Sequence, residues 1–225
     1  MNWSGGKDSA LALYHTLLRK DIEVKYLLTT VVEDSGEVAM HRVSPELLHR
    51  QAAELNIELI ELPLPEMPDN AVYEKRFTET NQKLIDEGVT HSIFGDLYLE
   101  DLKTYREERL KSVGMNGVFP LWKMPTREVA ESFFDLSFQA VVVCVDGSKL
   151  DASFCGRNYD RAFIKDLPDG VDVCGENGEF HTFVTAAPMF KKNISVQTAD
   201  LITRTFPSPT TNTSSTFHYA QIIAS

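Results

Sequence analysis

Hydrophobic and polar positions along the first part of the chain change between a helical and an extended pattern. After residue 9, apolar residues recur at the helical spacing i, i+3, i+4 and i+7, at Ala10, Leu13, Tyr14 and Leu17. A nearly continuous apolar run follows at 24–32, as expected for a strand that is buried on both faces. The alternation of helical and extended patterns continues along the chain. It predicts helices at 45–55, 70–87 and 101–113, and it predicts strands at 57–62, 90–94 and 118–121.

Local signals support these bounds. Ser44 is a good N-cap, Pro45 suits the first helical position, and Gly88 ends the helix before it. Three prolines predict a stiff connection after the second strand: Pro63, Pro65 and Pro68. The buried face of the helix at 70–87 is expected to carry Ala71, Tyr73, Phe77, Leu84 and Ile85.

Strands separated by helices predict an α/β fold with a parallel sheet covered on both faces. Right-handed crossovers bring the carboxyl ends of the strands to one edge of the sheet, where ligands bind. The pattern changes after Met124, with a helix to about residue 134, a strand at 138–145 and many turns beyond. We therefore expect a first domain at 1–126 and a smaller α+β domain at 127–225.

The end of the chain is expected to hold one more strand. Residues 207–216 are rich in Pro, Ser, Thr and Asn, which predicts a loop or a mobile linker. The apolar segment 217–224 is expected to return as the last strand.

Composition narrows the classes of function. The chain has 225 residues, 43% of them hydrophobic, which is enough for a substantial core. No apolar run reaches the about 18 residues of a membrane span, and the residues before position 4 are too few for a signal peptide or a full strand. The net charge of −11 disfavours general nucleic-acid binding. Three widely spaced cysteines without a Cys-x-x-Cys pair suit a reduced cytosol and argue against zinc. We expect a cytoplasmic protein.

The densest chemical signal is the hexapeptide Ser-Gly-Gly-Lys-Asp-Ser that directly precedes the first helix. Glycines allow the backbone to turn closely around an anion, and free N–H groups and the helix dipole favour phosphate at a helix N-terminus. A flexible helix start with a simple cap is the alternative. The common nucleotide loop Gly-x-x-x-x-Gly-Lys-[Ser/Thr] is absent from this segment. The predicted phosphate cradle consists of Ser4, Gly5, Gly6, Lys7, Asp8 and Ser9.

Further candidates follow the strands. Asp8 is expected either to bind Mg²⁺ or to cap the helix, since a carboxylate repels phosphate. Thr29 and Thr30 lie near the end of the strand at 24–32, where an adenine would lie, although threonine also simply favours strands. His41 follows a turn and is a candidate nucleotide or substrate contact, with a structural role as the alternative.

The strand at 90–94 leads into Gly95 and Asp96, at the predicted ligand-binding edge of the sheet. Arg106 and Arg109 lie on one face of the following helix and are candidates for a phosphate or a substrate carboxylate. For most charges of this helix, a solvated face with ion pairs at i, i+3 and i+4 is the simpler interpretation.

The last dense segment is Asp-Val-Cys-Gly-Glu-Asn-Gly-Glu-Phe-His-Thr at 172–182. Its carboxylates could attract a cation and accept a proton from an attacking amine. A Gly-Asn-Gly hairpin with exposed acids is the structural alternative. Candidate side chains here are Glu176, Asn177, Gly178, Glu179, His181 and Thr182. Upstream, Arg157 and Asn158 could hold an anionic group.

With these residues, the chain resembles the diphthine–ammonia ligase family of PP-loop ATP pyrophosphatases over nearly its whole length. The resemblance rests on the hexapeptide, on Phe-Gly-Asp at 94–96, on the arginine-bearing helix that leads to Pro-Leu-Trp at 120–122, and on Gly-Glu-Asn-Gly-Glu-Phe-His-Thr-Phe-Val at 175–184. It implies a Rossmann-like parallel sheet of the HUP (adenine nucleotide alpha hydrolase-like) type and a C-terminal substrate-binding domain. The Gly-Asp and Trp-Lys-Met stretches look more like the bacterial branch of the family.

The resemblance implies an ATP-dependent amide ligase. A substrate carboxylate would be adenylated with release of pyrophosphate, and ammonia would then displace AMP. In the family the substrate is diphthine on elongation factor 2, which bacteria are not expected to carry. The cofactors would be ATP and Mg²⁺, and ammonium would be the simplest nitrogen donor; a homo-oligomer is left open. Candidate catalytic residues are Lys7, Asp8, Glu176, Glu179 and His181. The alternatives are a PP-loop RNA-modifying sulfurtransferase that uses Cys174, and a regulator that binds ATP or AMP without turnover.

Overall fold

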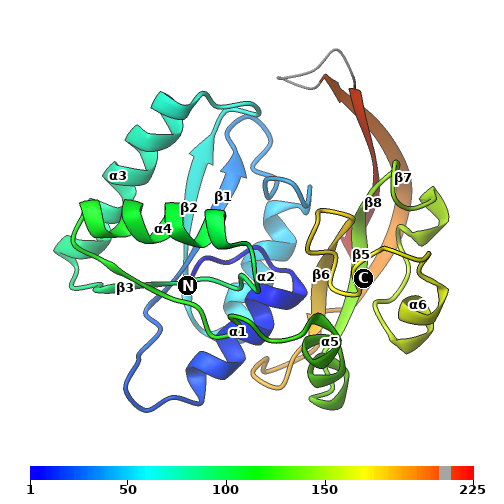
Figure 1. Ribbon diagram of the computed structural model, residues 1–225, viewed down its shortest axis with the longest axis horizontal. Coiled ribbons are helices and arrows are strands. Elements are labelled where there is room, and N and C mark those ends of the chain that lie inside the picture. The colour runs from blue at the N-terminus through cyan, green and yellow to red at the C-terminus, as the bar shows by residue number, and fades with distance from the viewer. Residues whose placement is uncertain (208–213) are drawn as a thin grey trace.

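The computed structural model describes residues 1–207 and 214–225, and its first half alternates helices and strands as the sequence predicts (Figure 1). The elements of this half are α1 (Lys7–Leu17), β1 (Tyr26–Val32), α2 (Pro45–Leu55), β2 (Glu58–Leu64), α3 (Asn70–Asp86), β3 (His91–Ile93), α4 (Glu100–Ser112) and β4 (Asn116–Val118). All strand pairs in this half are parallel: β1 pairs with β2, and β3 pairs with β4.

The first three residues join these two strand pairs into one surface. The backbone N–H of Trp3 donates to the Leu28 carbonyl over 2.8 Å, and the N–H of Asn2 donates to the Ile93 carbonyl over 2.9 Å. The spatial order is therefore β2, β1, residues 1–3, β3, β4. This order is Rossmann-like and places the following glycine loop at the carboxyl edge of the sheet.

Local sequence explains most element bounds. Ser44 caps α2 by accepting from the Leu47 N–H, and Asp69 caps α3 in the same way, over 2.7 Å from the Val72 N–H. Three expectations about the first half were wrong. Pro63 is not part of the connection, because β2 continues through it opposite Val31.

The predicted buried face of α3 also needs correction. Ala71 is exposed, whereas Asn81 is buried and donates from Nδ2 to the Phe77 carbonyl over 2.8 Å. The strand expected at 118–121 lies earlier, as β4, and the chain turns at Pro120, which has no N–H to offer a sheet.

The second half is built on an antiparallel sheet. Its elements are α5 (Thr126–Asp135), β5 (Gln139–Asp146), a 3₁₀ turn (Ala152–Phe154), α6 (Arg161–Asp166), β6 (Phe180–Ala186), β7 (Val196–Pro207) and β8 (Ser214–Ala224). The four-stranded sheet has the order β6-β5-β8-β7.

The loop expected at 207–216 is shorter than predicted, because β7 reaches Pro207 and β8 begins at Ser214; residues 208–213 lie outside the described residues. The aromatic rings of Phe206 and Phe217 pack across this hairpin at 6.1 Å between centroids, which stabilises strand pairing near its end.

The two sheets share one hydrophobic core. The buried cluster includes Leu11 and Leu13 of α1 together with Phe133 of α5 and Phe180 and Phe183 of β6. A backbone hydrogen bond also joins the halves, from the Val184 N–H to the Gly5 carbonyl over 2.8 Å. The division at residue 126 stays a prediction, since packing is continuous across it. Within residues 1–207 and 214–225, no helix combines the length and apolar character needed to cross a membrane.

Candidate active site

A cavity of about 530 Å³ opens at the carboxyl edge of the parallel sheet, and residues of α3, of α4 and of the second half of the chain are among those that line it. Twelve of the sequence-predicted site residues line it: Ser4, Asp8, Ser9, Thr29, Thr30, His41, Gly95, Asp96, Arg106, Arg109, Glu176 and His181. The structure thus brings residues of the first loop, β1, the turn before α2, the end of β3, α4 and the 172–182 segment to one place.

The glycine loop at 4–9 has a compact, hydrogen-bonded conformation. The Ser4 hydroxyl accepts the Gly6 N–H over 3.2 Å and lies 3.1 Å from the Ser9 hydroxyl, which donates to the Gly6 carbonyl over 3.0 Å. Gly5 has φ +75°, and a Cβ there would lie 2.6 Å from Oε1 of Gln51. Both the positive φ and the lack of space require glycine at this position.

Gln51 is a supporting residue that sequence reasoning missed. It is fully buried; Nε2 donates to the carbonyls of Gly5 and Val184 over 3.0 and 2.7 Å, and Oε1 accepts the Trp3 indole N–H over 3.0 Å. Its amide therefore joins α2, the loop and β6. In the sequence, Gln51 could have been recognised as a polar residue on the face of α2 that also carries the apolar residues Leu47 and Leu48.

Lys7 lies beneath the loop rather than in the cavity wall. Its ammonium donates to Asp8 Oδ2 over 2.8 Å and to the Cys174 carbonyl, and it lies 5.8 and 5.5 Å from the ring centroids of Tyr159 and Phe180. Burial alone would lower the pKa of Lys7, but Asp8 and the other nearby negative groups outweigh burial and raise it. The side chain is therefore a buried cation at the junction of the two halves.

Three carboxyl groups line the cavity: those of Asp8, Asp96 and Glu176. Asp8 Oδ1 and Asp96 Oδ2 are buried without a hydrogen-bond partner among the described residues, although Asp96 forms an ion pair with Arg106 at 3.3 Å. Burial raises the pKa of Asp96. Burial, and then the charge of Asp8, raise the pKa of Glu176 to about 8. Such an arrangement attracts a cation or holds a proton.

The carboxylates fit a magnesium ion that shares its ligands with a nucleotide. In the described part of the chain, no group of three or more His, Cys, Asp or Glu side chains could hold a metal by itself. Mg²⁺ usually takes one or two carboxylates together with phosphate oxygens. Asp8 Oδ1, which has no hydrogen-bond partner among the described residues, and the Asp96 carboxylate, which is paired with Arg106, supply such carboxylates.

Two histidine rings pack against each other in the cavity wall. The rings of His41 and His181 lie 4.6 Å apart between centroids with an angle of 39°. Burial lowers the pKa of His41 to about 4 and lowers the pKa of His181 well below its ordinary value. Both rings are therefore neutral at physiological pH and can serve as hydrogen-bonding or stacking surfaces.

The remaining residues of the 172–182 segment shape the loop instead of lining the cavity. The buried Glu179 carboxylate accepts the N–H groups of Asp172 and Asn177 over 3.2 and 2.8 Å and the Asn177 amide over 3.0 Å. Burial opposes its ionisation, but these hydrogen bonds lower the pKa of Glu179. Gly178 permits the turn with φ +78°.

Thr182 supports the phosphate loop from β6. Its hydroxyl accepts the backbone N–H of Lys7 over 3.0 Å, so it contacts the start of α1 directly. Thr29 of β1 also has an internal partner, because its hydroxyl donates to the Trp3 carbonyl.

The structure does not bring Arg157 and Asn158 to the cavity. The Arg157 guanidinium pairs with Asp166 over 2.7 Å and stacks on Phe154 and Phe163, while Asn158 is exposed beside β5. Neither residue can contact a ligand that lies in this cavity without a rearrangement of the 156–166 segment.

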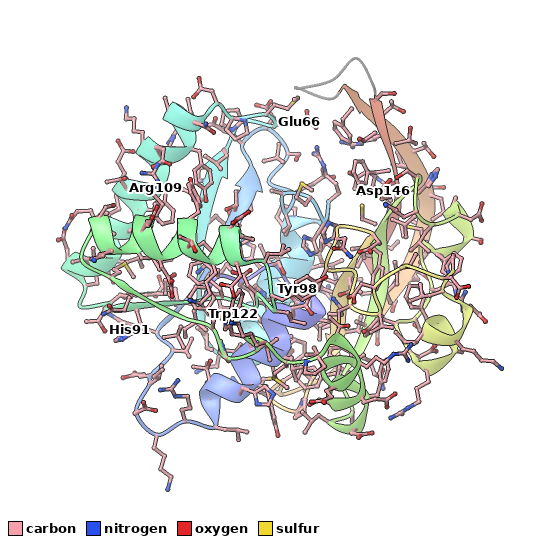
Figure 2. All side chains as sticks on the ribbon, viewed as in Figure 1. Glu66, His91, Tyr98, Arg109, Trp122 and Asp146 are labelled. Atoms are coloured by element: carbon pink, nitrogen blue, oxygen red, sulfur yellow. The ribbon has the colours of Figure 1, made fainter. Side chains whose placement is uncertain are left out.

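Arg106 and Arg109 of α4 line the cavity, and each already contacts another side chain of the protein. Arg109 pairs with Glu74 of α3, and Arg106 stacks on Phe94 at 4.4 Å; Figure 2 shows Arg109 on the side of α4 that faces α3. An apolar wall that sequence reasoning did not assign to a site surrounds them. Its members are Leu62, Tyr73, Phe77, Phe94, Leu102 and Tyr105. Flat aromatic rings beside a phosphate-type loop suit a planar base.

These features define an α/β protein of the Rossmann-like PP-loop class, with a glycine loop at a helix N-terminus on the carboxyl edge of a parallel sheet. Comparison with family models gives the particular family. The model described as diphthamide synthase N-terminal domain matches residues 1–117, and the model described as diphthamide synthase C-terminal domain matches residues 125–206. The chain belongs to the diphthamide synthase family.

Curated relatives agree with this family. A protein of Bos taurus named diphthine–ammonia ligase is 29% identical over 111 residues, which is 47% of this chain and 42% of that protein. The Homo sapiens protein of the same name is 28% identical over 110 residues, or 46% of this chain and 41% of that protein. The chain thus matches less than half of the length of these relatives.

Proposed function

We propose that the chain is an ATP-dependent amide ligase of the diphthine–ammonia ligase type. The observation that carries the proposal is the convergence of two distant segments in one cavity. Ser4, Asp8 and Ser9 of the phosphate-type loop face it together with Glu176 and His181. A nucleotide loop and a group able to move a proton are the two requirements of such a reaction.

We place the nucleotide along the carboxyl edge of the sheet. The loop at 4–9 would bind the departing pyrophosphate through backbone N–H groups, and Lys7 beneath it would supply positive charge. The base would lie near Thr30 and His41, against the apolar wall of the cavity. Asp8 and Asp96 would hold Mg²⁺, which neutralises charge on the phosphate oxygens when bound.

The chemical steps require few protein groups. A carboxylate oxygen of the substrate attacks the α-phosphorus, and the bond between that phosphorus and the bridging oxygen breaks to release pyrophosphate. The nitrogen of ammonia then attacks the acyl carbon, AMP leaves, and the nitrogen loses a proton. Glu176 is our candidate acceptor for this proton in its ionised form, because it lines the cavity together with the loop. Burial and Asp8 raise its pKa to about 8, so this form becomes more abundant as the pH rises toward 8.

The names of the relatives suggest the substrate class. They are diphthine–ammonia ligases, so the acyl substrate proposed here is diphthine on elongation factor 2, or an analogous carboxylate if the chain comes from a bacterium. Arg106 and Arg109 are candidates to bind the substrate carboxylate after exchanging their present partners. Tyr98 lies at the boundary between the halves in Figure 2, and its hydroxyl donates to Asn177 Oδ1 over 3.4 Å.

Sulfur transfer is the weaker alternative. The Cys174 thiol is buried and donates to the Thr126 carbonyl over 3.2 Å. Burial raises the pKa of Cys174 to about 12, so the reactive thiolate is scarce at neutral pH. A regulator that binds nucleotide without turnover differs from a ligase only in the fate of ATP.

Product analysis tests the proposal. The protein is incubated with ATP, Mg²⁺, ammonium and elongation factor 2 that carries diphthine, and nucleotides and the modified histidine are measured. AMP, pyrophosphate and an amidated histidine in equal amounts are expected. ADP and phosphate, or intact ATP in the presence of this substrate and of a bacterial extract, would overturn it.

A further inference from the structure

The outer edge of β7 is open over a long stretch. β7 lies at the end of the sheet order β6-β5-β8-β7, and β8 is the only strand that pairs with it among the described residues (Figure 1). Unpaired N–H and C=O groups on such an edge bind another strand unless charge, proline or a bulge prevents it. Between the irregularity at 198–200 and Pro207, β7 carries no lysine and no proline.

The charges on this edge are self-complementary. Asp200, Ile202 and Arg204 alternate along β7 and therefore share one face of the sheet. If a second β7 runs antiparallel with Ile202 opposite Ile202, each Asp200 lies opposite an Arg204 of the other copy. Two-fold symmetry forms this ion pair twice, and Leu201 then lies opposite Thr203. A register with Leu201 opposite Leu201 would instead place Asp200 opposite Ile202 and lose both pairs.

We propose that two copies of this chain associate through antiparallel pairing of β7 with β7, centred on Ile202. The two four-stranded sheets would then form one continuous sheet across the dimer. Leu201, which is 54% exposed in the single chain, would be partly covered. The association is independent of the proposed ligase reaction, because none of these residues lines the cavity.

The charges are available for such contacts. In the described residues, Asp200 has no ion-pair partner, and Arg204 has a long one, 3.9 Å from Glu66, which lies near the hairpin in Figure 2. Both groups of this internal pair are more than one-third exposed, so it contributes little. Arg204 could therefore leave Glu66 and pair with Asp200 of a second copy at little cost in free energy.

Charge reversal tests the register as well as the association. Molecular mass and the dissociation constant of the whole chain are measured by sedimentation over a range of concentrations. A dimer is expected for the parent. Asp200→Arg places arginine opposite arginine twice and should raise the dissociation constant about tenfold, as should Arg204→Asp. The double variant Asp200→Arg, Arg204→Asp restores opposite charges and should return the dissociation constant close to that of the parent.

Asp169→Arg is the matched control, because Asp169 is exposed in the same half of the chain but lies outside β7. It should leave the dimer unchanged, and circular dichroism of every variant should match the parent. A monomeric parent, a dimer insensitive to Asp200→Arg, an equal effect of Asp169→Arg, or no recovery in the double variant would each overturn the proposal. Faster amide exchange of 200–204 in the dilute parent than in the concentrated parent would support it if a single variant failed to fold.

Discussion

The backbone N–H of Lys7 donates to the hydroxyl of Thr182 over 3.0 Å, although 175 residues separate them in the chain. This contact attaches the first turn of α1 to β6. A second contact from this half is the hydrogen bond from the Val184 N–H to the Gly5 carbonyl, and the amide of Gln51 in α2 donates to the carbonyls of both Gly5 and Val184. The loop conformation therefore depends on both halves.

Thr182→Val should destabilise the protein and disturb the loop. Valine has nearly the same shape but cannot accept the Lys7 N–H, and an unpaired buried donor costs about 1–3 kcal/mol. Chemical denaturation should show this loss in the free energy of unfolding, and titration should show weaker ATP binding. Thr182→Ser keeps the acceptor and is the control; equal stability of the Val and Ser variants would contradict the role of this bond.

Lys7→Met should abolish ATP turnover and weaken ATP binding. Methionine fills the space between Tyr159 and Phe180 but removes the buried cation, so the carboxylate of Asp8 would face the phosphates without compensation. Binding is measured by calorimetry and turnover by release of pyrophosphate. Lys20→Met, at an exposed position, should behave as the parent. Unchanged ATP affinity of Lys7→Met would contradict the assignment of the phosphate loop.

Glu176 should make stability depend on pH. Its pKa is raised from 4.5 to about 8 in the folded protein, so between these values the folded chain holds a proton that the unfolded chain has released. The resulting stabilisation is complete below pH 4.5 and disappears as pH rises through 8.

Glu176→Gln keeps a neutral group at this position and should therefore be more stable than the parent at pH 8.5, with a difference that shrinks toward pH 5. Melting temperatures across this range measure the effect. Glu108→Gln is the control, at an exposed position of α4. Parallel pH curves for the parent and Glu176→Gln would show that the carboxyl group titrates normally.

Glu179→Gln should impair product formation while ATP binding stays largely intact. The carboxylate organises the 172–177 turn by accepting from Asp172 and Asn177, and an amide can replace only part of these bonds. The loss in stability should be about 2 kcal/mol, since hydrogen bonds to a charged group are among the stronger ones. A large loss of ATP affinity would instead place Glu179 in the nucleotide site; Glu23→Gln, exposed and far from the turn, is the control.

Cys174→Ser should retain ammonia-dependent activity. Serine preserves a donor for the Thr126 carbonyl, and no step of the proposed ligase reaction uses the thiol. The rate of pyrophosphate release with ammonium is the measurement, and Cys155→Ser is the matched buried control. Complete loss of activity for Cys174→Ser alone, or a persulfide on this residue, would favour sulfur transfer.

Much of the architecture was predictable because its causes are local. Helical periodicity and the caps Ser44 and Asp69 define α2 and α3, and the exchange of strands and helices specifies a parallel sheet. The same holds for the loop at 4–9, where glycines precede a helix. The hairpin of β7 and β8 was missed in part, because its strands lack an apolar alternation strong enough to outweigh the Pro- and Thr-rich composition.

The sequence by itself determined the loop, the order of the elements and the density of acids at 172–182, since each depends on neighbours in the chain. Only the tertiary structure decided which of these residues meet. The sheet topology brings Glu176 and His181 to the cavity that the loop at 4–9 also lines. Arg157 instead pairs with Asp166, and the Glu179 carboxylate accepts a backbone N–H of its own segment, that of Asn177. The tertiary structure also buries Lys7 below the loop, and it places the Gln51 amide where it donates to the Gly5 carbonyl. Such contacts depend on the pairing of distant strands and on which buried polar groups remain to be satisfied, and neither is encoded in local periodicity.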